Sequence, residues 1–188
     1  MYPNKKEVSS LKKQKSLPEA GVVFVKDENG RYFLAEKVIG RDENEEKIGE
    51  GRLNGLGGGR NLKETQKEAI IREALEEYGF ILHKKSIHLK AIVFCCNEKN
   101  DGSVFICKLY VFVATKWKGI ISASDEMING EWFLKEDVPY DQMIVTDKDW
   151  LPFVFDGESL YAWVFLRNSQ REKTRETQIK FVKNLSCT

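Results

Sequence analysis

The sequence predicts a single α/β (α+β) domain in which one strong helix accompanies several β-rich segments. Residues 65–78 are the best helical segment, because Thr65 and Glu68 form a capping box and Gly79 is a natural stop. Apolar, β-rich segments separated by Asn- and Gly-containing turns fill most of the remaining chain. No linker divides the 188 residues, of which 41% are hydrophobic, so we expect one core.

The N-terminal segment, residues 1–18, is polar and rich in lysine, which predicts a flexible arm ahead of a domain over residues 19–188. A nucleic-acid-binding tail is the alternative. The segment has no apolar signal-peptide region, and no stretch has the roughly 18 apolar residues of a membrane span. The net charge of +1 makes a nucleic-acid partner unexpected. We therefore expect a cytoplasmic protein without a membrane partner; nothing in the sequence specifies an oligomeric state.

The remaining elements follow from hydrophobic patterning and turn chemistry. Residues 40–51 are highly charged and indicate a surface loop, and residues 55–59 indicate a glycine-rich turn. A second helix is expected at residues 147–155. The expected strands are residues 21–25 and 31–38 joined at Asn29-Gly30, residues 87–96 and 104–115 joined at residues 100–102, residues 129–134, and a closing pair at residues 160–166 and 178–182.

The first helix separates apolar from acidic residues when each residue advances the helix by about 100°. Glu73, Glu76 and Glu77 lie on one side, and Ala69 on that side would leave room for a ligand. The opposite, apolar stripe comprises Ile71, Ala74, Leu75 and Tyr78. An ordinary solvated acidic face is the alternative interpretation.

Two observations favour a metal site over that alternative. Carboxylates spaced three and four residues apart repel one another by a few tenths of a kcal/mol, on the order of 0.2–0.5 per pair, and a divalent cation would remove this cost. The preceding glycines allow backbone groups to approach phosphate closely. Oxygen ligands of this kind suit Mg²⁺ or Mn²⁺. Arg72, four residues before Glu76, is interpreted as an organiser of the acidic residues, with a surface ion pair as the alternative.

These residues also fill a longer pattern: Gly, five residues, Glu, seven residues, Arg-Glu, an apolar residue, any residue, Glu-Glu, any residue, Gly and an apolar residue. The positions that fill it are Gly58, Glu64, Arg72, Glu73, Ala74, Glu76, Glu77, Gly79 and Phe80. The pattern resembles the signature of the Nudix hydrolase family. That resemblance implies a mixed β-sheet sandwiched between helices, a catalytic loop–helix–loop, and Mg²⁺-dependent hydrolysis of a diphosphate linked to another group, with Mn²⁺ as a possible substitute.

Carried over by position, the resemblance assigns metal binding to the carboxylates of Glu73, Glu76 and Glu77 and to the Gly57 carbonyl. It assigns support of the helix and loop to Glu64 and Arg72. These assignments place the catalytic chemistry in one short segment of the chain.

The resemblance extends beyond this segment, over residues 20–182, to the MutT-like enzymes that hydrolyse oxidised purine nucleoside triphosphates. Residues 53–58, Leu-Asn-Gly-Leu-Gly-Gly, are similar to their Trp-Asn-Gly-Phe-Gly-Gly, and residues 124–127 match their Ser-Asp-Glu-Met. The match implies that Glu126 reaches the metal site from another loop, as a ligand or as a general base.

Four further positions are implied to contact substrate. Asn54 matches an asparagine that binds the purine, Asp147 matches an aspartate that reads the base edge, Phe94 matches an aromatic lining the base pocket, and Lys37 matches a lysine near the substrate. Core packing, a surface charge or, for Asp147, a helix N-cap is the alternative role.

Two positions depart from that pocket. Thr146 replaces one of two adjacent aspartates, and Ile144 replaces a stacking tryptophan, so Ile144 would offer the base apolar contact without an aromatic face. The expected reaction is hydrolysis of 8-oxo-dGTP or a related purine triphosphate to monophosphate and pyrophosphate, which would sanitise the nucleotide pool. The alternatives are a pyrophosphatase acting on ADP-ribose or another nucleoside diphosphate sugar, a dinucleoside polyphosphate or capped RNA, and a nucleotide-sensing module without catalysis.

Overall fold

The computed structural model of the protein describes residues 17–38, 49–99 and 101–186. Residues 1–16 of the expected arm, and residues 40–48 of the expected charged loop, lie outside the described residues. Within the described part, no helix is long and apolar enough to cross a membrane.

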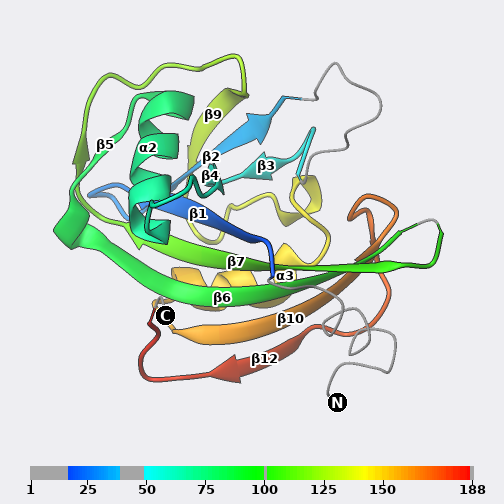
Figure 1. The fold of residues 1–188 in the computed structure, drawn as a ribbon. Helices are drawn as coiled ribbons and strands as arrows, with labels where there is room; N and C mark the ends of the chain where they lie inside the picture. The colour runs from blue at the N-terminus through cyan, green and yellow to red at the C-terminus, as the bar shows by residue number, and fades with distance from the viewer. Residues whose placement is uncertain (1–16, 39–48, 100, 187–188) are drawn as a thin grey trace.

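The described elements follow the predicted order closely (Figure 1). The helices are α2 (Gln66–Tyr78) and α3 (Asp147–Phe155), with short 3₁₀ turns η1 (Lys84–Ser86) and η2 (Tyr140–Gln142). The strands are β1 (Glu19–Lys26), β2 (Tyr32–Lys37), β3 (Leu53–Asn54), β4 (Leu56–Gly59), β5 (Ile81–Leu82), β6 (Ile87–Glu98), β7 (Val104–Ala114), β8 (Trp117–Lys118), β9 (Met127–Phe133), β10 (Leu160–Arg167), β11 (Glu172–Lys173) and β12 (Gln178–Phe181).

The main sheet is mixed, as the family resemblance implied. Its central path runs β11-β10-β6-β7-β1-β2-β3, with β12, β4 and β9 paired to β10, β1 and β2. The pairs β1–β7 and β6–β10 are parallel, whereas the predicted hairpins β1–β2 and β6–β7 and the closing pair β10–β12 are antiparallel. The predicted strands therefore exist, and their pairing brings the N-terminal, central and C-terminal parts of the chain into one sheet.

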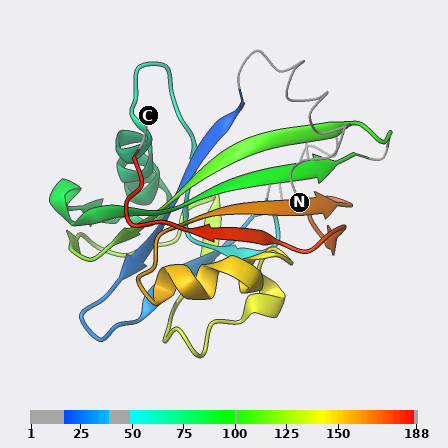
Figure 2. The same ribbon diagram turned by 90° about the horizontal axis from the view of Figure 1, so that it is seen from below.

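The two helices cover opposite faces of this sheet (Figure 2). Along β1, Val22 and Phe24 pack in the core cluster that includes residues of α3. The intervening Val23 and Val25 pack in the cluster that includes residues of α2. This alternation is that of a strand buried on both faces, and it produces two hydrophobic layers.

Helix α2 begins and ends where the sequence predicted. The Thr65 side chain accepts a hydrogen bond from the Glu68 backbone N–H, and the Glu68 side chain accepts one from the Thr65 N–H. Gly79 adopts the left-handed conformation, and its N–H donates to the Leu75 carbonyl at 2.9 Å. Both ends are therefore fixed by local hydrogen bonds.

The glycine-rich segment differs from the prediction of a turn. Residues 56–59 form strand β4, which pairs antiparallel with β1 and places Gly57 opposite Val22. A Cβ atom at Gly57 would collide with the carbonyl oxygen of Gly21. Glycine is thus required here for close approach between neighbouring strands, which local turn chemistry does not reveal.

The buried face of α2 is rotated relative to the predicted apolar stripe. Leu75 is 50% exposed, whereas Ile70 and Ala69 are fully buried. Ala69 therefore packs in the interior and leaves no space for a ligand, contrary to the prediction. Glu77 is also buried, because α2 packs against both β1 and β4 and this second contact covers one edge of the predicted acidic side.

Candidate active site

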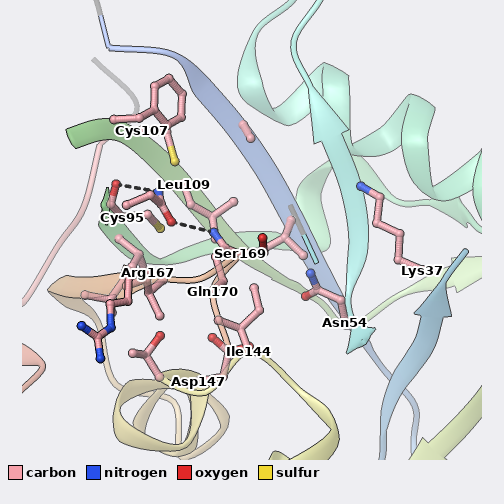
Figure 3. Close-up of a pocket in the computed structure, with 18 of the residues that line it drawn as sticks. Lys37, Asn54, Cys95, Cys107, Leu109, Ile144, Asp147, Arg167, Ser169 and Gln170 are labelled. Atoms are coloured by element: carbon pink, nitrogen blue, oxygen red, sulfur yellow. Dashed lines mark hydrogen bonds between the residues drawn. The ribbon is translucent and has the colours of Figure 1, made fainter. Parts of the chain in front are cut away.

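A cavity of about 940 Å³ opens between β4, the β6–β7 hairpin and the start of α3. The glycines of β4 line one part of it, and the turn after β10 lines another. Figure 3 shows Lys37 and Asn54 on one side and Cys95, Arg167 and Gln170 on the other. The cavity is large enough for a ligand of nucleotide size.

Arg72 donates hydrogen bonds to three carboxylates, one in the loop before α2 and two on the helix. Its Nε and Nη2 donate to the two oxygens of Glu64 at 2.9 and 3.2 Å. Its Nη1 donates to Glu73 at 2.8 Å and to Glu76 at 2.9 Å, and its Nη2 also donates to the Gly59 carbonyl at 3.2 Å. Arg72 is therefore an organiser of the loop and the helix rather than one half of a single ion pair.

The Glu64 carboxylate is the strongest partner of this guanidinium. Its hydrogen bonds from Arg72, joined by one from the Asn61 backbone N–H at 3.0 Å, lower the pKa of Glu64 to about 2. The same interaction with Glu64 raises the pKa of Arg72 further above its usual range. This fixed ion pair connects the loop before α2 to the middle of the helix.

Two glycines of β4 allow two carboxylates of α2 to lie close to the strand. The Gly57 N–H donates to Glu77 Oε2 at 2.7 Å. A Cβ atom at Gly58 would lie 2.9 Å from Glu73 Oε1, so glycine at this position gives the carboxylate room to approach. The sequence pattern therefore has a steric basis: β4 and α2 are in contact through glycine backbone and glutamate side chains.

Glu77 is the buried member of the acidic group. Burial raises the pKa of its carboxyl to about 8; the Gly57 hydrogen bond opposes this shift, and the nearby Glu73 adds to it. Lys37 and Glu126 are also close enough to influence the pKa of Glu77, in opposite directions. Glu126, from the loop before β9, is therefore brought towards the α2 carboxylates as the resemblance implied.

The side chains of this region fit a hard divalent cation in chemical type. All the donors are carboxylate or carbonyl oxygens, and a buried carboxylate beside other acids is the environment in which a cation offsets repulsion. Among the described residues, no three acidic, histidine or cysteine side chains are already gathered at metal-binding distance. Arg72 instead binds one oxygen each of Glu73 and Glu76.

Four of the five residues expected to contact substrate line the cavity: Lys37, Asn54, Ile144 and Asp147. The Asn54 Oδ1 accepts a hydrogen bond from the Gly55 N–H at 2.8 Å, which fixes the orientation of its amide. These four residues lie together at one cavity, as expected for residues that contact the same ligand.

Phe94 is the exception, and its predicted place in the pocket is wrong. Its ring stacks on Trp163 on the other face of the sheet, with centroids 5.6 Å apart. The neighbouring Val93 and Cys95 line the cavity instead. Successive residues of a strand point to opposite faces of the sheet. Because β6 has a register irregularity between Leu89 and Ala91, the face to which each later side chain points is set by pairing within the sheet and not by sequence position alone.

Asp147 lies at the first position of α3, and Thr146 is the N-cap, although Thr146 makes no side-chain capping hydrogen bond. The alternative role of Asp147 as the N-cap is therefore wrong. Its side chain is buried, and burial raises the pKa of its carboxyl to about 7. An uncharged or partly charged acid thus faces the cavity near neutral pH.

We expect Asp147→Asn to make the ligand-free protein relatively more stable at high pH. The pKa of about 7 in the folded state exceeds the usual value of 3.8, so between these two pH values the folded chain binds more protons than the unfolded chain. The stability contributed by the neutral carboxyl is full below about pH 4 and is lost as pH rises through 7. The melting-temperature difference, variant minus wild type, should increase on the order of 5 °C between pH 4.5 and 8.5. An unchanged difference would contradict the raised pKa.

The sequence missed several polar residues of the cavity. Trp150, Asn97 and Gln170 all line it, together with the cysteine pair Cys95 and Cys107, which lie directly opposite each other on β6 and β7. Their polarity at the ends of apolar segments was the only available signal. Their convergence depends on pairing between β6, β7 and β10, which are distant in sequence.

The chain is similar in sequence to known proteins. The family model described as the NUDIX domain matches residues 15–154. An oxidized purine nucleoside triphosphate hydrolase of Danio rerio is 33% identical over 138 residues, covering 71% of this chain and 78% of that protein. The mouse protein of the same name is 31% identical over 107 residues, covering 57% of this chain and 65% of that protein.

Solved structures share the fold at lower sequence identity. The MutT protein of Bacillus halodurans superposes with a TM-score of 0.66 at 20% identity, covering 87% of this chain and 97% of that one. The MutT protein of Methanosarcina mazei gives a TM-score of 0.55 at 20% identity, covering 77% and 96%. With the family model spanning most of the chain and the acidic segment in place against β4, the chain belongs to the Nudix hydrolase family.

Proposed function

We propose that the protein is a Mg²⁺-dependent hydrolase that converts a purine nucleoside triphosphate, 8-oxo-dGTP or a related nucleotide, to monophosphate and pyrophosphate. The observation that carries this proposal is that the β4 glycines, Asn54 and Asp147 line one cavity. Phosphates at the glycines and a base near Asp147 would both fit in one bound nucleotide. The names of the zebrafish and mouse relatives support the same substrate class.

In this proposal the site residues have three roles. Glu73, Glu76, Glu77, Glu126 and the Gly57 carbonyl hold the metal. Arg72 and Glu64 keep the loop and α2 in register, as their hydrogen bonds already do. Lys37 offsets phosphate charge, and Asn54, Ile144 and Asp147 contact the base.

Hydrolases of this family generally use divalent metal ions such as Mg²⁺. When bound, the ion would neutralise charge on the diphosphate oxygens and orient the attacking water. Glu126 is an exposed carboxylate close enough to influence Glu77, which supports its proposed role as a ligand of the ion or as the base that accepts a proton from that water. The product pair follows from cleavage between the first and second phosphates.

Two other functions are alternatives to this proposal. Another nucleoside diphosphate derivative, such as ADP-ribose, a dinucleoside polyphosphate or capped RNA, would use the same acidic segment with a different pocket. A nucleotide-sensing module would bind without turnover. The persistence of three neighbouring carboxylates, one of them buried, favours catalysis because a binding module has no need for their mutual repulsion.

A substrate panel separates these functions. The purified protein is incubated with Mg²⁺ and, separately, with 8-oxo-dGTP, dGTP, ATP, ADP-ribose and a dinucleoside polyphosphate, and both phosphate and pyrophosphate are measured. We expect pyrophosphate from a purine triphosphate. Turnover of ADP-ribose without any triphosphate would reject the MutT-like assignment, and turnover of nothing would favour the sensing module.

Asn54→Ala should raise KM more for purine than for pyrimidine triphosphates. The amide is held in the cavity wall by its bond to the Gly55 N–H, so its nitrogen is left to face a ligand. Loss of one neutral hydrogen bond predicts an increase of about 2- to 12-fold in KM for purines. Equal increases for both base classes would argue against recognition of the base by Asn54.

A further inference from the structure

Gln170 lies across the cavity from Lys37 and Asn54 (Figure 3), and it forms a polar pair with Asn97 that the proposed mechanism leaves unused. Asn97 comes from β6, and Gln170 comes from the turn between β10 and β11; both line the cavity. Gln170 is only 6% exposed. A buried carboxamide in a surface turn is unusual, because turn side chains of this type are usually hydrated.

Hydrogen bonds fix the orientation of the Gln170 amide. The Asn97 Nδ2 donates to the Cys95 carbonyl at 3.2 Å, which leaves the Asn97 Oδ1 as an acceptor. The Gln170 Nε2 donates to that oxygen at 3.1 Å. Within the described residues, the Gln170 Oε1 has no hydrogen-bond partner. The nitrogen of this amide is therefore used by the protein, and its oxygen is a buried, unused acceptor.

The backbone that positions this acceptor is strained. Asn168, Ser169 and Gln170 have φ angles of 49°, 51° and 64°, a left-handed run that residues with a Cβ rarely adopt. The Arg171 N–H closes the turn on the Asn168 carbonyl at 3.0 Å. Strain of this kind persists only where surrounding contacts hold it, and here it directs a side chain into a cavity.

Another buried polar atom without a hydrogen-bond partner in the described chain, Thr146 Oγ1, belongs to a residue that lines the same cavity. The apolar side chains of Leu109 and Ile144 line the cavity with it. The lining thus combines apolar surface with an unpartnered amide oxygen and an unpartnered hydroxyl. A flat heterocycle with polar groups on its edge matches a lining of this kind.

We propose that Gln170 is a specificity-determining residue whose Oε1 accepts a hydrogen bond from the exocyclic amino group of a bound purine. This inference rests on the proposed function, in which the substrate is a purine nucleotide. Because the bond from Nε2 to Asn97 fixes the orientation of the amide, the unpartnered Oε1 is the acceptor that Gln170 offers to a ligand. It therefore selects for an amino group and against a base that lacks one.

The test compares two nucleotide pairs that differ only by the amino group: dGTP with dITP, and dATP with 2′-deoxynebularine triphosphate. In at least one pair, Gln170→Met should lower the preference in kcat/KM for the amino-bearing nucleotide about tenfold, equivalent to about 1.4 kcal/mol, mainly through KM. Unchanged preferences in both pairs for Gln170→Met would overturn the inference.

A second comparison distinguishes base from sugar. Dideoxy-GTP lacks the 3′-hydroxyl of dGTP, and the ratio between these two should be the same for the wild type and Gln170→Met. A change confined to this ratio would assign the acceptor to the ribose and overturn its assignment to the base.

Gln66 provides the matched control. It is 5% exposed, and its Oε1 also lacks a partner among the described residues, but it does not line the cavity. Gln66→Met should leave both nucleotide preferences unchanged. A shift equal to that of Gln170→Met would show a general effect of losing a buried amide and would overturn the inference.

The inference and the proposed function can fail separately. Absence of triphosphate turnover by the wild type would reject the proposed function. In that case the wild type and Gln170→Met are compared by the Kd of each nucleotide, measured by calorimetry with α,β-methylene analogues of the two pairs. The predicted tenfold change then applies to the preference in Kd for the amino-bearing nucleotide. Turnover with unchanged preferences would reject only the role of Gln170.

Discussion

We expect Glu77→Gln to reduce Mg²⁺-dependent turnover at least about 100-fold while the fold is retained. Glu77 is the buried carboxylate that links α2 to β4 through the Gly57 N–H. Glutamine keeps an oxygen for that hydrogen bond but loses the charge proposed to bind the metal. Metal stabilisation of a transition state is worth several kcal/mol, which corresponds to a loss of this size.

The measurement is kcat/KM for the best triphosphate of the panel, alongside thermal unfolding. The melting temperature should not fall, because glutamine replaces a carboxyl whose charged form is disfavoured by burial and preserves the backbone hydrogen bond. Glu131→Gln, at an exposed position of β9, is the matched control and should have wild-type activity. Wild-type turnover by Glu77→Gln would refute its role in the metal site.

Arg72→Lys should lower turnover about 10- to 100-fold. The guanidinium binds Glu64, Glu73 and Glu76 together with the Gly59 carbonyl, and a lysine ammonium cannot reproduce this fork of donors. The two α2 carboxylates would lose their fixed positions although the positive charge remains. We therefore expect a higher Mg²⁺ concentration for half-maximal activity as well as a lower maximal rate.

Arg31→Lys is a suitable control, because Arg31 also forms an ion pair with an acid four residues away, Asp27, but does not line the cavity. Its activity and Mg²⁺ dependence should match the wild type. An Arg72→Lys variant with an unchanged Mg²⁺ requirement would show that this network does not position the metal-binding carboxylates.

The sequence predicted best those features that neighbouring residues determine. Thr65, Glu68 and Gly79 set the ends of α2 through hydrogen bonds within a few residues. The Asn29-Gly30 turn likewise joined two correctly predicted strands. The acidic segment was also predictable, because its residues lie within one helix turn or at fixed short distances from it.

Features that depend on pairing between distant segments were not predictable in the same way. Strand β4 forms because its glycines fit against β1, and Phe94 faces away from the cavity because the sheet fixes the phase of β6. Gln170 reaches Asn97 only through the parallel pairing of β10 with β6. The sequence therefore predicted the arrangement of the acidic segment more completely than the lining of the cavity.

The central claim, metal-dependent cleavage of a nucleoside triphosphate between its first and second phosphates, is tested most directly by product analysis. The wild-type protein is incubated with 8-oxo-dGTP and Mg²⁺, and products are separated by ion-exchange chromatography. We predict one 8-oxo-dGMP and one pyrophosphate per substrate consumed, with turnover abolished by EDTA and restored by excess Mg²⁺. Release of 8-oxo-dGDP with orthophosphate, or turnover unaffected by EDTA, would contradict the claim.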